Sequence, residues 1–269
     1  MGSATVALDD GGTLAYDEAG AGPAVILIHP GLWDRRTWDD QMASFPAAGY
    51  RTIRYDVRGY GGSSRPTGAP YSHVRDLLAL LDALGVEEAA LVGCSMGGSI
   101  AIDATIIHPD RVWSLVPVAA GLGGFEPTQE EEDWWGDVDE PIEAAIEAGD
   151  LQTAQLLRLR IWAPLGLDDE AGRRIRDIAF DNLHELEMDE SAAEELDPPA
   201  ALRLREIDVP SLVIKAEHDP ADMRRISDLV AASVQGARIT MLDADHVVNV
   251  RRPEAFDAVV LPFLDEHRP

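Results

Sequence analysis

The chain has 269 residues, 46% of them hydrophobic and 26% charged, which is an ordinary composition for a globular protein of one or two domains. Its 49 acidic residues outnumber its 22 basic residues and give a formal net charge of −27. A surface of this sign repels phosphate backbones and anionic lipids, so the composition argues against binding to nucleic acid or to a membrane.

Cysteine use and the N-terminal sequence favour a protein of the cytoplasm. Cys94 is the single cysteine, which excludes an internal disulfide and is compatible with a reducing compartment. Residues 1–10 have no basic segment followed by an apolar run, and no apolar stretch approaches the ~20 residues of a membrane helix. We therefore expect a soluble cytoplasmic protein, whose oligomeric state the sequence leaves open.

Short apolar runs alternate along the chain with longer segments of helical period. Strands are predicted at Thr13–Asp17, Val25–Ile28, Tyr50–Tyr55, Ala89–Val92, Val112–Val118, Ser211–Lys215 and Ala237–Leu242. Helices are predicted at Val74–Leu84, Met96–Ile107, Met223–Ser233 and Pro253–Leu264. The first strand follows a turn and suits an antiparallel hairpin, whereas the others are continuously apolar, as in a parallel sheet covered by helices on both faces. The sequence therefore predicts an α/β fold.

The alternation stops between about residues 121 and 208. This stretch has helix-like patterns at Pro141–Ala148 and Leu151–Ile161, and no convincing strand interrupts it. Glycines at its start and the Asp197-Pro198-Pro199 segment near its end are typical of domain edges. We predict a core domain of residues 1–120 and 209–269, with a helical cap of residues 121–208 inserted after the sixth strand of the sheet.

The strongest chemical signal is Gly93-Cys94-Ser95-Met96-Gly97-Gly98, between a predicted strand and a predicted helix. A serine in such a turn has a strained backbone that lifts its hydroxyl above the sheet, and a Cβ at Gly93 or Gly97 would collide with neighbouring backbone. The amide of Met96 lies at the positive end of the helix, where it can stabilise an oxyanion. The pattern predicts Ser95 as a nucleophile; the alternative is a chance match in a glycine-containing loop.

A serine hydroxyl needs a base to become a good nucleophile. His246 follows the last predicted strand and precedes the last helix, so its loop lies at the carboxyl end of the sheet, near Ser95. We therefore predict His246 as the general base. Among the other histidines, we assign structural roles to His29 and His108. We expect His73, His184 and His267 to lie at the surface.

The base in turn needs a carboxylate that fixes its tautomer. Asp219 follows the strand Ser211–Lys215 and completes the chain order Ser, Asp, His that is associated with a nucleophile turn of this kind. Glu217 and Asp222 are the local alternatives.

The second oxyanion donor is expected in the loop after the strand Val25–Ile28. Gly31 is the predicted donor, and Leu32 is the alternative, because the sequence does not determine the geometry of the loop. Asp56 and Arg58 follow the next strand and are interpreted as structural residues that hold neighbouring loops. Their glycine-containing surroundings do not fit a dinucleotide-binding motif, since the third glycine is missing and no helix begins there.

Together these segments resemble the α/β-hydrolase superfamily, and within it the group of 3-oxoadipate enol-lactonases and related small-molecule esterases. Further matching blocks are Ile28-His29-Pro30-Gly31 with Trp38, Asp56 to Ser63, and His246 to Phe256. The resemblance implies a mostly parallel eight-stranded sheet with helices on both faces, a helical cap over the site and no cofactor. No metal site is predicted.

The departures from related subfamilies bear on the substrate. Epoxide hydrolases and haloalkane dehalogenases resemble this pattern but place Asp where Ser95 stands, and Pro30 and Val247 depart from the pattern of carbon–carbon bond hydrolases. We therefore expect cleavage of a small-molecule carboxylic ester or lactone. A carbon–carbon hydrolase of a diketone, a cofactor-free haloperoxidase or acyltransferase, and a non-catalytic ligand-binding protein remain alternatives. Candidate pocket residues are Trp33, Trp134, Trp135, Trp162 and Val247. For Trp134, Trp135 and Trp162, packing of the cap helices against each other is the alternative.

Overall fold

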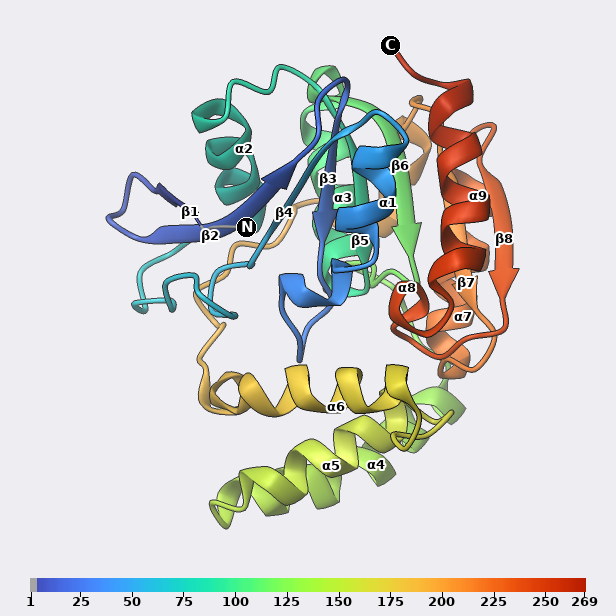
Figure 1. Ribbon diagram of the computed structural model, residues 1–269. Coiled ribbons are helices and arrows are strands. Elements are labelled where there is room, and N and C mark those ends of the chain that lie inside the picture. The colour runs from blue at the N-terminus through green and yellow to red at the C-terminus, as the bar shows by residue number, and fades with distance from the viewer. Residues whose placement is uncertain (1–3) are drawn as a thin grey trace.

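The computed structural model describes residues 4–269, and one eight-stranded sheet forms its centre (Figure 1). The strands are β1 (Ala4–Ala7), β2 (Thr13–Ala19), β3 (Ala24–Ile28), β4 (Arg51–Tyr55), β5 (Ala89–Cys94), β6 (Val112–Val118), β7 (Leu212–Ala216) and β8 (Arg238–Leu242). Their order across the sheet is β1-β2-β4-β3-β5-β6-β7-β8. The pairs β1–β2 and β2–β4 are antiparallel and all the others are parallel, so the sheet is mixed but mostly parallel, as predicted.

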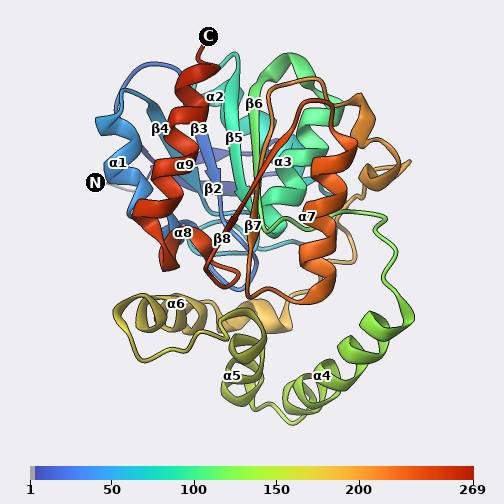
Figure 2. The same cartoon turned by 90° about the vertical axis from the view of Figure 1, so that its right-hand side faces the viewer.

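Helices cover both faces of this sheet. The α-helices of the described residues are α1 (Gln41–Ala47), α2 (His73–Ala83), α3 (Met96–Ile107), α4 (Gln129–Glu147), α5 (Leu151–Trp162), α6 (Glu170–Asp181), α7 (Ala221–Ser233), α8 (Val248–Arg251) and α9 (Pro253–Glu266), and not all of them lie on the faces of the sheet. Apolar side chains of α2, α3 and α7 form the core on one face, and those of α1 and α9 form it on the other. Figure 2 shows the two layers on opposite sides of the sheet. None of the helices between residues 4 and 269 has both the length and the apolar character needed to cross a bilayer.

The burial of the strands explains why their sequences are continuously apolar. β3, β5 and β6 are buried along their whole length, because helices pack on both of their faces. β8 is different: its residues are exposed or half-buried, since it is the last strand at one edge of the sheet.

Helices α4, α5 and α6 form a separate layer beyond the carboxyl ends of the parallel strands (Figures 1 and 2). All three lie in the range 121–208, where the sequence predicts a helical cap, and none of the named strands falls in that range. An apolar cluster that includes Leu32, Trp33, Leu159, Ile175 and Val247 joins this layer to the loops of the sheet. The division into a core and a cap domain stays a prediction.

Candidate active site

Ser95 lies in a sharp turn between β5 and α3. Its φ of 52° and ψ of −114° place it in a strained region of backbone space that non-glycine residues rarely adopt. The Ser95 amide donates a hydrogen bond to the carbonyl oxygen of Val118 at 2.9 Å. This bond ties the turn to the end of the neighbouring strand β6, so the surrounding structure holds the strained conformation.

Glycines make the turn possible. A Cβ on Gly93 would lie 2.1 Å from the carbonyl oxygen of Gly97, and a Cβ on Gly97 would lie 2.3 Å from that of Ile28. These distances explain both glycines that the sequence analysis singled out. Gly98 is a third, since a Cβ there would lie 2.5 Å from the side chain of Ala120. The need for glycine at position 98 comes from the packing of the turn against Ala120, just after β6, and the sequence motif alone does not reveal it.

Asp219 and His246 form a buried hydrogen-bonded pair. Nδ1 of His246 lies 2.8 Å from Oδ1 of Asp219, and each side chain is only 2% exposed. Asp219 follows β7 and His246 follows β8, so two adjacent parallel strands bring the residues together at one edge of the sheet. The competing carboxylates lie elsewhere, since Asp222 accepts a hydrogen bond from Trp135 Nε1 at 2.8 Å and Glu217 is exposed.

The pair lies beside the serine turn. Sγ of Cys94, the residue before Ser95, donates to the carbonyl oxygen of His246 at 3.3 Å. The structure therefore places the Asp219–His246 pair next to the turn that carries Ser95. Because Nδ1 of His246 faces Asp219, Nε2 is the ring nitrogen available to a hydroxyl or a substrate.

A buried ion pair fixes the loop that carries His246. Arg251 on α8 lies 2.7 Å from Asp245, and both side chains are nearly inaccessible to solvent. Burial raises the pKa of Asp245, and hydrogen bonding and charge from Arg251 act in the opposite direction. Arg251 also contacts Asp169, the N-cap residue of α6, at 3.0 Å. The loop is thereby tied to the helical layer that covers the sheet.

The loop after β3 provides the candidates for a second oxyanion donor. Leu32 has a φ of 69°, so its backbone is held in the left-handed region, directly after Gly31. His29 anchors the loop: its Nε2 accepts from the Val57 amide at 2.9 Å, and its Nδ1 donates to the Pro30 carbonyl at 2.8 Å. Because Nε2 accepts a hydrogen bond, the imidazole is neutral, and burial lowers the pKa of His29 in the same sense; His29 is a structural anchor, as predicted. Both amides, of Gly31 and of Leu32, stay candidates.

Asp56 and Arg58 hold loops, as the sequence analysis predicted. Asp56 accepts hydrogen bonds from the amides of Arg35 and Gly62 at 2.9 and 2.7 Å. Arg58 contacts both carboxylate oxygens of Asp76 at 2.8 Å, which joins the loop after β4 to helix α2.

The five candidate pocket residues occupy different environments. Trp33 and Val247 are fully buried in the apolar cluster between the two layers, and Trp33 Nε1 donates to the Ile175 carbonyl at 2.8 Å. Trp134 is 41% exposed and lines a cavity of about 570 Å³ between the starts of α4 and α7. Trp135 and Trp162 lie between Trp134 and the site, in a row of ring contacts.

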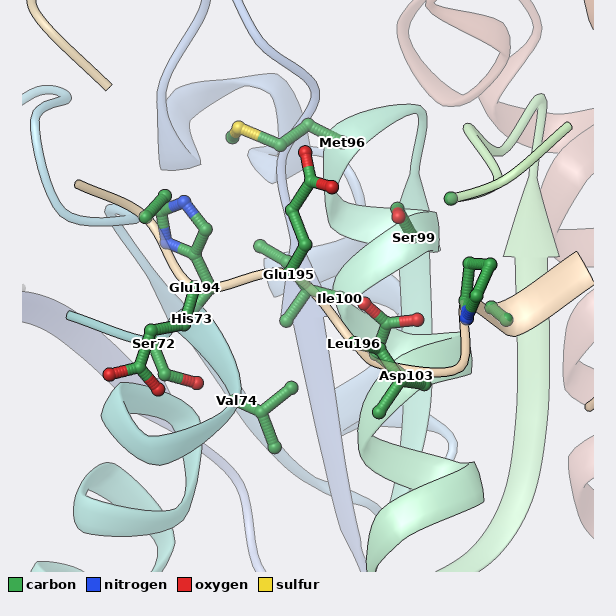
Figure 3. A pocket seen from close by; sticks show the side chains of 14 residues that line it. Ser72, His73, Val74, Met96, Ser99, Ile100, Asp103, Glu194, Glu195 and Leu196 are labelled. Atoms are coloured by element: carbon green, nitrogen blue, oxygen red, sulfur yellow. The ribbon is translucent and has the colours of Figure 1, made fainter. Parts of the chain in front are cut away.

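A cavity of about 210 Å³ opens beside the first turn of α3 (Figure 3). It lies between α2 and α3, and the segment 193–200 crosses over it. Met96 lies at one end, and Asp103 lies two turns farther along α3. Burial raises the pKa of Asp103 to about 6. The cavity therefore leads from the residue after Ser95 into an acidic recess.

His73 lines the same cavity and is half-buried, although the sequence assigns it to the surface. Its Nδ1 is buried without a hydrogen-bond partner among the described residues, and burial lowers its pKa to about 4. No local pattern predicts this environment, because the segment 193–200 that lines the cavity together with His73 is far from it in the chain.

One group of described residues has side chains suited to a metal ion. Glu217, His218 and Asp243 offer ligand atoms within 4.8 Å of one another, and His218 Nε2 lies 2.8 Å from Asp243. Glu217 and Asp243 are exposed at the edge of the sheet.

Comparison with known proteins identifies the family. The family model described as alpha/beta hydrolase fold matches residues 23–253 of this chain. The chain belongs to this family. An epoxide hydrolase of Caballeronia sordidicola is 43% identical over 106 residues, which are 38% of this chain and 32% of that protein. The chain spans only about a third to a half of the length of the epoxide hydrolases that it matches.

Two relatives match over nearly the whole of this α/β-hydrolase. The 3-oxoadipate enol-lactonase 2 of Acinetobacter baylyi is 28% identical over 88% of this chain and 87% of that protein. The crystal structure of the enol-lactonase from Burkholderia xenovorans LB400 has a TM-score of 0.75 and 25% identity, and the match covers 98% of this chain and 100% of that one. The predicted resemblance to enol-lactonases is therefore confirmed.

Proposed function

We propose that this α/β-hydrolase cleaves a small-molecule carboxylic ester or lactone through an acyl-enzyme on Ser95. The observation that carries the proposal is the buried Asp219–His246 pair next to the strained serine turn. A serine, a base and an orienting carboxylate are the groups that acyl transfer requires. Similarity to enol-lactonases over most of the chain supports a lactone or ester as the substrate class.

The proposed reaction has two halves. His246 Nε2 removes the proton of the Ser95 hydroxyl as its oxygen attacks the carbonyl carbon, and the carbonyl oxygen becomes an oxyanion. The amides of Met96 and of Gly31 or Leu32 stabilise this charge. Removing one such donor costs about 10²- to 10³-fold in rate in a comparable serine enzyme. The tetrahedral intermediate then collapses, and the leaving alkoxide takes the proton from His246.

Water completes the cycle. His246 removes a proton from a water molecule as the water oxygen attacks the acyl-enzyme, and Ser95 leaves with the proton returned by His246. Asp219 stabilises the imidazolium in both halves without being protonated. A lactone yields one hydroxy acid, because its alkoxide stays attached to the acyl group, whereas an ester yields an acid and an alcohol.

A fluorophosphonate probe tests the nucleophile directly. We expect the wild-type chain to be labelled once, at Ser95, and Ser95→Ala to remain unlabelled. Asp219→Asn should slow hydrolysis by roughly 10⁴-fold, since the base then has the wrong tautomer. Ser233→Ala, at the far end of α7, serves as the matched control and should label like the wild type. No labelling of the folded wild type would contradict the proposal.

A panel of substrates tests the class of bond. We expect turnover of lactones and short acyl esters, and no hydrolysis of an epoxide, because Ser95 stands where epoxide hydrolases are expected to have Asp. A vinylogous diketone in the same panel separates ester cleavage from carbon–carbon cleavage. Turnover of the epoxide or the diketone, with the esters and lactones untouched, would contradict the assigned substrate class.

A further inference from the structure

The indole ring of Trp162 packs against the imidazole of His246. The two ring centroids are 4.3 Å apart, and the ring planes are inclined at 41°. The backbones also meet, since the His246 amide donates to the Trp162 carbonyl at 3.3 Å. Trp162 is the last residue of α5. A helix of the covering layer therefore contacts both the ring and the backbone of the proposed base.

Trp162 is itself supported from behind. The ring of Trp135 on α4 lies 5.5 Å from that of Trp162, at an interplanar angle of 37°. Trp135 Nε1 donates to Asp222 at 2.8 Å. Asp222 lies in the first turn of α7, three residues after Asp219. Two sets of contacts therefore connect the β7–α7 junction with His246. Asp219 contacts its Nδ1 directly, and Asp222 contacts Trp135, which packs on Trp162 against the imidazole ring.

We propose that Trp162 is a positioning residue for His246. It holds the plane of the imidazole while Asp219 fixes the tautomer, and its π-face stabilises the imidazolium that forms when Ser95 loses its proton. An aromatic face attracts a cation most strongly where both groups are shielded from water, and His246 is only 2% exposed. This inference rests on the proposed role of His246 as the base.

The other groups around His246 supply little further charge. Asp219 from the β7–α7 loop contacts Nδ1, and the neighbouring Asp245 is paired with Arg251 of α8. The thiol of Cys94 at the end of β5 contacts the His246 carbonyl, and burial raises the pKa of this thiol well above its usual value, so it stays uncharged. Because Arg251 balances the charge of Asp245, the indole of Trp162 and the carboxylate of Asp219 are the direct contacts of the imidazole ring that favour its protonated form.

Kinetics of two variants test the inference. Trp162→Leu removes the π-face, and we expect kcat to fall about 10- to 30-fold with little change in KM. The acidic limb of the kcat/KM profile should move to lower pH, because the cationic form of the base has lost a stabilising contact. Trp162→Phe keeps an aromatic face and should recover most of the loss. A merely structural role for Trp162 would leave the position of the acidic limb unchanged.

Tryptophan fluorescence provides a readout that does not depend on turnover. A protonated imidazole quenches an indole that it touches, so emission should fall on acidification as His246 gains its proton. Trp162→Phe and His246→Asn should each abolish this transition. Trp134→Phe is the matched control: Trp134 contacts Trp135 at 4.8 Å, with no ring contact to His246, and its variant should keep the transition.

The outcomes separate this inference from the function on which it rests. No fluorophosphonate labelling of the wild type means that the proposed function has failed. If the wild type is labelled and a folded Trp162→Leu variant shows the same labelling rate and pH profile, the positioning role is wrong. Persistence of the quenching transition in Trp162→Phe also overturns it.

Discussion

At the scale of single residues, the serine turn is the least tolerant part of the chain. Gly97→Ala would place a Cβ 2.3 Å from the carbonyl oxygen of Ile28, and backbone atoms cannot move aside as a flexible side chain can. We expect the free energy of unfolding to fall by about 3 kcal/mol or more and the activity to disappear. Chemical denaturation followed by circular dichroism measures the first effect.

Gly136→Ala is the matched control for that substitution. Gly136 lies inside helix α4, and a Cβ there meets nothing within 4 Å. Because alanine is the better helix former, this variant should be stabilised by up to about 1 kcal/mol. If Gly97→Ala were as stable as Gly136→Ala, the packing described for the turn would be incorrect.

Cys94 gives a second prediction for a single residue. Its side chain is fully buried, burial raises its pKa well above the usual value, and its thiol is engaged by the His246 carbonyl. A disulfide reagent reacts only when an accessible thiolate attacks one of its sulfur atoms and displaces the other as a thiol. We therefore expect no reaction of the native protein with an aromatic disulfide, and one equivalent of released thiol after unfolding. Rapid reaction of the native protein would show that the turn opens to solvent.

At the scale of elements, the loop between β8 and α8 depends on one buried charge pair. Arg251→Met leaves the Asp245 carboxylate without its partner, in a place where water cannot replace it. Breaking a buried pair costs roughly 3–5 kcal/mol, so this variant should unfold at much lower denaturant concentration. The double variant Asp245→Asn with Arg251→Met should recover part of this loss, because it no longer buries an unpaired charge. Equal stability of the single and double variants would contradict this view.

Local patterns were sufficient for most elements of the sheet domain. Helix α3 begins and ends at the predicted residues, Met96 and Ile107, and the buried strands agree with their predicted ranges within one or two residues. For helix α4, the helix-like pattern covers only Pro141–Ala148. The helix begins at Gln129 and continues through Pro141. The Thr128–Glu131 capping box was the sequence signal for the true start.

The candidate site was predictable only in part, for a physical reason. Ser95, Asp219 and His246 each follow a strand of the parallel part of the sheet. The shared direction of these strands brings all three residues to the carboxyl ends of the strands. The contact of Trp162 with His246 and the buried position of the His73 Nδ1 atom depend on how the α4–α6 layer and the segment 193–200 pack on the sheet. No periodicity within one segment determines such packing.

At the scale of the whole molecule, charge is the unusual property. With 49 acidic and 22 basic residues, 27 negative charges are left unbalanced, and their mutual repulsion opposes the compact state. Raising the salt concentration from about 0.1 M to 1 M shortens the Debye length from about 10 Å to about 3 Å. We therefore expect the Tm to rise by several degrees in sodium chloride, measured by calorimetry at constant pH.

Helix α4 provides a matched test of the origin of this effect. Glu140, Glu143 and Glu147 are exposed on it at spacings of three and four residues, so their like charges are neighbours on its surface. Glu143 and Glu147 also lie near its carboxyl end, where the helix dipole disfavours negative charge. Glu143→Gln with Glu147→Gln should raise the Tm at low salt and reduce its dependence on salt. If the Tm of the wild type instead fell with salt, the ion pairs of its surface would outweigh the repulsion among its unpaired acids.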